Sequence, residues 1–293
     1  KLPAANSMPR HKIVTCLLVL FLFNHSYGCL VELYPGTYSH NNRFHYRYNI
    51  NILKKYKQDP RRRSKCQNKI EDPHYFDVLI FTQHWPQTVC YLWKEKSESH
   101  ACALPKDDEW SIHGIWPTKY HSEGPNFCNN SLPFNASTLL PIKNELETKW
   151  IDVRNENDTY SLWRHEWNKH GTCAAVLPAL NSELKYFQKG IELLDIYDMK
   201  NVLGKLNIVP GRSYAIQDIS DGIKKVIGKT AEIVCAHNEV SNQYIFEIRI
   251  CFDKTLQLVD CDGINGFPAN TCRDSTQVIY PGYVPSFYNV IQI

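Results

Sequence analysis

The feature that most constrains this chain is a set of ten cysteines downstream of a short apolar segment. The chain has 11 cysteines in 293 residues. Cys16 lies inside the apolar segment, and the other ten run from Cys29 to Cys272. An even number of cysteines in a secreted chain is typical of a disulfide framework. No two of them have the C-x-x-C spacing of a zinc ribbon, so the sequence favours disulfides over structural metal.

The apolar segment has the pattern of a secretory signal peptide. Residues 13–23 are an almost unbroken apolar run of 11, with basic residues before it and small residues after it. A membrane span needs about 20 apolar residues, whereas a signal peptide has this length and these flanks. We therefore expect cleavage near Gly28, no membrane span, and a secreted or alternatively lysosomal protein. Met8 is a candidate start that would make residues 1–7 a leader, and a buried helix or an uncleaved anchor is the alternative interpretation.

Charge divides the remaining chain into a basic extension and an acidic body. Residues 29–65 carry a net charge of +7 and residues 66–293 a net charge of −7, while the whole chain is at +3. A protein that binds nucleic acid over a broad surface normally has a basic body, so a polyanion would be bound only locally. The triplet 61–63 (RRR) is a solvated run, a polyanion-binding patch or a processing site. We expect a signal peptide (1–28), the extension (29–65) and one domain (66–293).

Strand and helix patterns are mixed irregularly through the expected domain. They lack the regular βαβ order of a parallel sheet. The sequence therefore predicts an α+β fold, with a central antiparallel sheet flanked by helices in a single disulfide-stabilised domain. We expect strands over 78–81, 244–252 and 256–259, and helices over 137–150, 159–173 and 181–197.

Three N-x-S/T sequons lie within the same domain. They fall in a stretch that we interpret as surface, where the side-chain amides would carry N-glycans. The expected glycosylation sites are Asn129, Asn135 and Asn157.

Two segments combine histidine with tryptophan. The first is 110–117 (WSIHGIWP), and the second, 162–173 (LWRHEWNKHGTC), is expected to be helical. On an ideal α-helix Glu166 and His170 share one face, and Lys169 lies beside them. One helical face would then offer a carboxylate, an ammonium and an imidazole.

The second segment has to be tested for zinc, because His165-Glu166 suggests a metalloprotease helix. That motif needs two histidines four residues apart. His165 and His170 are five apart, which rotates them by roughly 140° about an α-helix, so their side chains would diverge. We therefore expect no metal. Gly171 is expected to end the helix and Cys173 to tether it.

Two imidazoles accompanied by a carboxylate and an ammonium suit acid–base chemistry. An imidazole both accepts and donates a proton near neutral pH, and a paired base and acid with a cation nearby suits phosphoryl transfer without metal. The tryptophan rings are either stacking platforms for unpaired bases or ordinary core residues, and spacing alone favours the core. They are Trp85, Trp110, Trp116, Trp163 and Trp167.

The two segments resemble the active-site signatures of the ribonuclease T2 family. Residues 111–117 (SIHGIWP) match the first signature, with Ile115 where leucine is usual, and residues 165–173 (HEWNKHGTC) match the second. Residues 83–86 (QHWP) are similar to the family's base-binding strand. The likeness covers about residues 77–280 and is greatest to the animal secreted or lysosomal branch.

The resemblance implies an endoribonuclease that cleaves single-stranded RNA through a 2′,3′-cyclic phosphate without a cofactor. His170 would take the proton from the ribose 2′-OH, and His113 would protonate the departing 5′-oxygen. Glu166 and Lys169 would stabilise the phosphorane, and His165 would hold a phosphate oxygen. Because the 2′-OH is the nucleophile, DNA should resist cleavage. The base sites would be lined by Trp116, Gln83, His84 and Trp85.

The resemblance also implies four disulfides: Cys90–Cys102, Cys128–Cys173, Cys235–Cys272 and Cys251–Cys261. Cys29 and Cys66 remain, and they could pair with each other or link two chains. We expect a monomer, with a dimer linked through Cys29 or Cys66 as the alternative.

A secreted binding or signalling glycoprotein with a vestigial nuclease site is the rival interpretation. No expected catalytic position is substituted, which favours an active enzyme. The acidic body would repel RNA at neutral pH, and protonated histidines would weaken that repulsion. We therefore expect a bell-shaped rate profile centred below pH 7. An active enzyme could also reach other cells and act there as a toxin or an immune signal.

Overall fold

The computed structural model describes residues 74–97, 99–155, 158–238, 242–264, 272, 277–282 and 290–292. The expected signal peptide, the basic extension, Cys29, Cys66 and the sequon at Asn157 lie outside the described residues. Residues from Asp72 to Ile293 form one compact unit. Within the described ranges, no helix has the length and apolar character needed to cross a bilayer.

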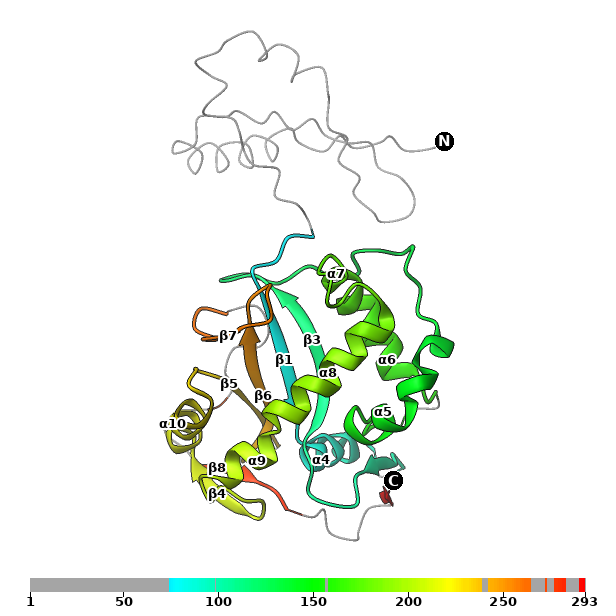
Figure 1. The fold of residues 1–293 in the computed structure, drawn as a ribbon. Coiled ribbons are helices and arrows are strands. Elements are labelled where there is room, and N and C mark those ends of the chain that lie inside the picture. Colours follow the sequence, from blue (N-terminus) through cyan, green and yellow to red (C-terminus); the bar gives the residue numbers. More distant parts are fainter. Residues whose placement is uncertain are drawn as a thin grey trace, which may run out of the picture. The chain divides into compact units, whose positions relative to one another are not determined.

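Helices and strands are interspersed along the described chain (Figure 1). The strands are β1 (Val78–His84), β2 (Cys102–Leu104), β3 (Ser111–Thr118), β4 (Arg212–Ala215), β5 (Glu232–His237), β6 (Gln243–Phe252), β7 (Leu258–Val259), β8 (Gln277–Tyr280) and β9 (Val290–Gln292). The α-helices are α4 (Pro86–Lys96), α5 (Lys143–Lys149), α6 (Ser161–Glu166), α7 (Thr172–Ala174), α8 (Glu183–Tyr197), α9 (Met199–Gly204) and α10 (Ile216–Ile227). A 3₁₀-helix, η3 (Ala136–Ile142), and a π-helix, η4 (Trp167–Gly171), complete the set. The predicted α+β class is confirmed.

Seven strands form one sheet, in which β1 lies between β3 and β6. The strand order is β3-β1-β6-β8-β4, and β5 and β7 also pair with β6. The pairings are antiparallel, except that β6 meets β8 in parallel through Tyr244 and Ile279. Strands β2 and β9 form a separate parallel pair. The central antiparallel sheet is therefore confirmed. Strand β7 pairs antiparallel with β6 and covers only the last two residues of the strand expected over 256–259.

The two faces of the β3–β1–β6 region have different surroundings. Leu79 and Phe81 of β1, together with Ile248 and Ile250 of β6, belong to the main hydrophobic core with Tyr186 of α8. Helix α8 crosses β3 and β1 in Figure 1 and contacts both. Because side chains alternate along a strand, the intervening residues face the opposite side. That side carries buried polar groups: Thr82, His84, Glu247 and Arg249.

Helix α8 forms where its periodicity predicts. The Ser182 hydroxyl accepts a hydrogen bond from the backbone N–H three residues later, which caps the helix. Phe187 and Leu194 are buried on one face of this helix. The segment 137–150 forms one α-helix only in its second half, because its first half is the 3₁₀-helix η3 with Pro141 inside it.

Four disulfides link the described residues: Cys90–Cys102, Cys128–Cys173, Cys235–Cys272 and Cys251–Cys261. These are the four pairings that the family resemblance implies, and they are confirmed. The bridge from Cys128 joins the loop after β3 to α7, directly after the π-helix. This loop is also attached by the backbone, since the Phe127 N–H donates to the Lys169 carbonyl at 2.9 Å.

Replacing Cys128 and Cys173 together by serine is predicted to cost about 2–5 kcal/mol of unfolding free energy. The bridge spans a sequence separation of 45, whereas Cys90–Cys102 spans 12, and a longer loop loses more entropy on closure. Urea denaturation of this variant and of a Cys90→Ser/Cys102→Ser variant measures the loss of unfolding free energy for each bridge. An equal or larger loss for the Cys90/Cys102 variant would contradict this loop-entropy explanation.

Candidate active site

His113 occupies a β-bulge at the centre of the polar face. Thr82 of β1 lies opposite Gly114 and Gln83 lies opposite Ile112, so His113 is the extra residue of β3. A bulge redirects the side chain that it carries. The His113 Nδ1–H donates to Glu247 Oε1 at 2.6 Å, and its Nε2 lies 3.9 Å from Glu166 Oε1. The side chain is 30% exposed, so the imidazole is accessible.

His170 lies on the π-helix η4, and this corrects the α-helix expectation. A π-helix bonds residues five apart, so side chains at i and i+5 come near each other. The rings of His165 and His170 are 6.4 Å apart, and the prediction that they diverge is wrong. The prediction that Gly171 ends the helix is also wrong, because the chain continues into α7. A Cβ at Gly171 would lie 2.3 Å from the Trp167 ring, so this position has no room for a side chain.

The indole of Trp116 connects the two histidine segments. Its ring centre lies 5.0 Å from that of His113 and 5.4 Å from that of His170. The indole Nε1–H donates to Glu166 Oε2 at 2.8 Å. The two imidazoles therefore converge on one region, although 57 residues separate them in the sequence.

The two imidazoles have pKa values displaced in opposite directions. Burial alone would lower the pKa of His113, but the carboxylate of Glu247, and more weakly that of Glu166, raise it above its ordinary value. Burial, with the neighbouring Lys169 cation, holds the pKa of His170 well below its ordinary value. Near pH 6.5 His113 therefore keeps its proton while His170 is neutral. This is the pairing of one acid with one base that proton transfer needs.

The remaining predicted catalytic groups surround His170. Burial raises the pKa of Glu166 to about 7, against the opposing effects of His113, Trp116 and Lys169. His165 is exposed, and its pKa is lowered by partial burial and by the Lys169 cation. The Glu166 carboxyl group, which titrates near neutrality, thus lies near His170 together with two hydrogen-bond donors, Lys169 and His165.

The residues of the QHWP segment are placed differently from one another. Gln83 is fully buried, where its amide donates to the Tyr197 carbonyl and accepts from the Met199 N–H. Trp85 is also fully buried, with Nε1 donating to a backbone carbonyl. His84 lies against His113 with ring centres 5.4 Å apart. Strand β1 continues to His84, three residues beyond the end of the predicted strand. Because side chains alternate along a strand, Gln83 faces the core as Leu79 and Phe81 do.

His84 is a neutral imidazole beside the acid–base pair. Burial, followed by the charge of His113, lowers the pKa of His84 to about 3. Its Nε2 is buried and has no hydrogen-bond partner among the described residues. Trp85 and the four tryptophans of the two histidine segments are at most 4% exposed, as expected of core residues.

Glu247 and Arg249 belong to the site but were missed in the sequence interpretation. Both lie on the side of β6 opposite its apolar residues, a side to which the sequence interpretation assigned no role. The structure buries them at 1% and 3% exposure. Glu247 Oε2 accepts from Arg249 Nε at 3.0 Å and from Nη2 at 2.6 Å. Two opposite charges two residues apart on an otherwise apolar strand were the available signal.

His165, Glu166 and His170 could together hold a metal ion. One donor atom from each lies within 4.8 Å of the others. The π-helix creates this grouping by bringing His165 to the same side as His170. The sequence argument against zinc, which assumed α-helical geometry, therefore does not apply to these side chains. Acid–base catalysis by the two imidazoles has no step that requires such an ion.

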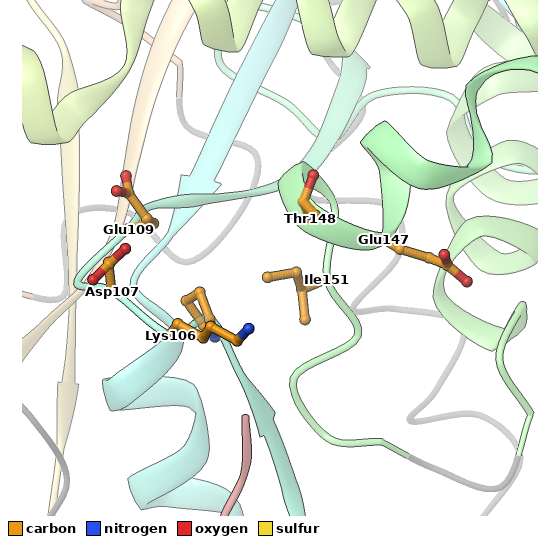
Figure 2. A pocket seen from close by; sticks show the side chains of 7 residues that line it. Lys106, Asp107, Glu109, Glu147, Thr148 and Ile151 are labelled. Atoms are coloured by element: carbon orange, nitrogen blue, oxygen red, sulfur yellow. The ribbon is translucent and has the colours of Figure 1, made fainter. Parts of the chain in front are cut away.

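A further pocket has a lining of its own (Figure 2). Its lining is largely charged and includes Lys106, Asp107, Glu109, Glu147 and Ile151. None of the predicted site residues lines it. Glu109 and Glu147 are already paired with Lys200 and Lys143.

The fold and the site define a disulfide-bonded α+β domain with a paired-imidazole acid–base centre. The family model described as the Ribonuclease T2 family matches residues 76–261. The chain therefore belongs to the ribonuclease T2 family of RNA-cleaving endoribonucleases. The predicted family is confirmed.

Curated relatives and solved structures agree with this assignment. Ribonuclease Oy of Magallana gigas is 34% identical over 217 residues, which cover 72% of this chain and 97% of the relative. Human Ribonuclease T2 is 40% identical over 201 residues, 67% of this chain and 74% of the relative. The crystal structure of human RNase T2 matches with a TM-score of 0.59 and 35% identity over 71% of this chain and 99% of that one. A mutant of RNase MC1 in complex with 5′-GMP matches with a TM-score of 0.59 and 27% identity over 70% of this chain and 100% of that one.

Gly114→Ala is predicted to disrupt the site. The added Cβ would lie 2.1 Å from Glu166 Oε2 and 2.2 Å from Trp116 Nε1, which would break the hydrogen bond between them. Because misplacing a group by about 1 Å can cost on the order of 100-fold in rate, RNA cleavage should fall by about that factor. Gly204→Ala, where no atom lies within 4 Å of the added Cβ, is the control. Full activity of Gly114→Ala would contradict the described packing.

Proposed function

We propose that this protein is a secreted endoribonuclease that cleaves single-stranded RNA by metal-independent transphosphorylation, with His170 as general base and His113 as general acid. The observation that carries this proposal is the convergence of two imidazoles whose pKa values are displaced in opposite directions. Family membership supports the reaction class. The base and acid assignment follows from which imidazole holds its proton.

In the proposed mechanism, neutral His170 accepts the proton of the ribose 2′-OH. The 2′-oxygen then forms a bond to the adjacent phosphorus, and the bond from phosphorus to the 5′-oxygen breaks. Protonated His113 gives its Nε2 proton to that 5′-oxygen, so the leaving nucleoside departs as an alcohol. The product is a 2′,3′-cyclic phosphate, which water can open later. DNA lacks the 2′-OH and is not a substrate.

Glu166, Lys169 and His165 would act on the crowded phosphorane. Lys169 supplies positive charge, and both Lys169 and His165 supply hydrogen-bond donors for its oxygens. Since the pKa of Glu166 is about 7, its carboxyl group is largely protonated in mild acid and can donate a hydrogen bond there. The reacting phosphate would thus meet donors on the side of His170 and a proton source on the side of His113.

For the bases, we propose His84 and Trp116 as the walls next to the scissile bond. His84 is the QHWP residue that contacts His113. Gln83 and Trp85 are fully buried and would support this wall from behind. A structural relative, the RNase MC1 mutant, is in complex with 5′-GMP, which supports a nucleotide-binding site in this fold.

The proposal also covers processing, destination and glycosylation of the chain. We propose signal cleavage near Gly28, a basic extension over 29–65, a monomeric catalytic domain from residue 66, and a secreted or lysosomal destination. Asn129 and Asn135 are exposed. Each side-chain oxygen accepts from the hydroxyl of its sequon serine, Ser131 or Ser137. Exposure supports both asparagines as glycan acceptors.

The rate of RNA cleavage should follow a bell-shaped pH profile. It rises as His170 loses its proton, below pH 6.5, and falls as His113 loses its proton, above pH 6.5, since the pKa of the base is lowered and that of the acid is raised. Measuring kcat/KM from pH 4 to 9 on a single-stranded oligoribonucleotide tests this. Flat activity up to pH 9 would contradict the two-histidine mechanism.

His113→Gln and His170→Gln should each lower kcat on RNA by about 10²- to 10⁴-fold, the usual contribution of a general acid or base. The exposed His74→Gln is the matched control and should keep full activity. Assays with RNA and with DNA in EDTA test the substrate and the metal at once. Cleavage of DNA, loss of activity in EDTA, or an unimpaired His170→Gln would each refute the proposal.

A secreted glycoprotein with a vestigial site remains the competing function. A folded and glycosylated His170→Phe variant separates the two. If it keeps the biological effect of the protein, that effect does not depend on RNA cleavage.

A further inference from the structure

A chain of charged groups leads from Glu232 of β5 through the buried Arg249 and Glu247 to His113. Glu232 Oε2 lies 3.5 Å from Arg249 Nη1. Arg249 donates two hydrogen bonds to Glu247 Oε2, from Nε at 3.0 Å and from Nη2 at 2.6 Å. The other oxygen of Glu247 accepts from His113 Nδ1 at 2.6 Å. Each oxygen of this carboxylate therefore has its own cationic or N–H donor.

The strand register places these groups together. His84 of β1 lies opposite Glu247 of β6, and Thr82 lies opposite Arg249. Glu247 and Arg249 are two residues apart and so share one face of the sheet. His113 is on β3, at the other edge of β1, in the bulge that redirects its ring. Glu247 therefore reaches His113 across the central strand.

We propose that Glu247 is the positioning residue for His113: its carboxylate, fixed by Arg249, holds the imidazole by Nδ1 so that the protonated Nε2 points to the leaving 5′-oxygen. This inference rests on the proposed role of His113 as general acid. A carboxylate on Nδ1 accepts only, so this nitrogen must carry a hydrogen, and Nε2 is left as the atom that exchanges the catalytic proton.

The surroundings of Glu247 keep its carboxylate ionised. Burial would raise its pKa, but His113 and then Arg249 lower the pKa of Glu247 to about 2. It is therefore charged throughout the working range and favours the imidazolium form of His113. The other groups that act on the charge of His113 are Arg249 from β6, His84 from β1, Glu166 from α6 and the histidines at 165 and 170. Within the described residues, Glu247 is the charged group that forms a hydrogen bond with the His113 ring, and the other groups act on its charge without such a bond.

Two fixed hydrogen bonds from Arg249 make Glu247 a rigid support. A carboxylate held at one oxygen could rotate and carry the imidazole with it. Arg249 Nε and Nη2 both donate to Oε2, and His113 Nδ1 donates to Oε1, so the carboxylate is held at both of its oxygens. Arg249 also lies 5.3 Å from the centre of the Trp116 ring, the same indole that bonds Glu166. The positions of His113 and of the Glu166 carboxyl group are thus both tied to the Arg249–Glu247 pair, the first directly and the second through Trp116.

The test is the Glu247→Gln variant, with kcat and KM measured on RNA across pH. Loss of an opposite charge at this range moves a pKa by about 1 to 3 units, so the descending limb of the profile should move down by that amount. At pH 7 kcat should fall on the order of 100-fold, with KM little changed. Histidine NMR should show the same downward movement of the His113 titration.

Two further variants separate positioning from folding. Glu247→Gln leaves Arg249 buried without its carboxylate, which could unfold the chain. The Glu247→Gln/Arg249→Gln double variant removes both charges and should move the limb in the same direction but by less, because Arg249 itself lowers the pKa of His113. Glu183→Gln replaces another buried glutamate, 7% exposed and bonded to Asn135 N–H, and should leave the pH profile unchanged. A descending limb that stays in place in the folded double variant would overturn the inference.

A substrate with an activated leaving group distinguishes failure of this inference from failure of the proposed function. A nucleoside 3′-(4-nitrophenyl) phosphate has a leaving group that departs without protonation, so a defect in the general acid should largely disappear. His113→Gln and Glu247→Gln should both retain most of the wild-type rate on it. If His113→Gln stays impaired, His113 is not the general acid, and the proposed function fails. If only Glu247→Gln stays impaired, Glu247 does not act through His113, and this inference alone fails.

Discussion

Desolvation of ionisable groups on one face of the sheet is the constraint on which the site depends. The same burial that lowers the pKa of His170 raises that of Glu166, because both lose the charged form when water is removed. His113 would follow His170 if burial acted alone. The Glu247 carboxylate reverses the direction for His113. The same desolvated face therefore holds a neutral imidazole, His170, and a charged one, His113, because among the described residues Glu247 bonds to the ring of His113.

The two imidazoles proposed to be catalytic are both carried by local irregularities in otherwise regular elements. A bulge of one residue turns His113 out of the β1–β3 ladder, and a π-helical turn changes the phase of the chain before His170. Insertions of this kind weaken local hydrogen bonding, so they persist where surrounding contacts hold them. Here Trp167 packs against Gly171, and the Cys128–Cys173 bridge follows at once. The regular sheet and helices thus supply rigidity, and the two irregularities set the orientation of the His113 and His170 side chains.

Regular elements were predictable from the sequence, and the irregular ones were not. The period of 181–197 and the alternation of 244–252 arise from burial on one face, which composition records directly. The bulge and the π-turn depend on partners far along the chain, such as β1 for His113 and Trp116 for Glu166. No local period encodes those partners. The motif match found His113, Glu166 and His170 without this geometry, whereas Glu247, outside the motifs, became visible only through the strand register.

The burial of Glu247 and Arg249 also shows why polarity on a strand is a poor guide to exposure here. An alternating strand in an antiparallel sheet normally directs its polar residues to water. In this sheet the Trp116 ring of β3 lies 5.3 Å from Arg249 on the polar side, and its indole bonds Glu166. A buried ion pair rarely adds net stability relative to apolar packing, so stability does not explain its presence. Its location beneath the imidazole, with both carboxylate oxygens engaged, is accounted for by the orientation and the protonation that it imposes on His113.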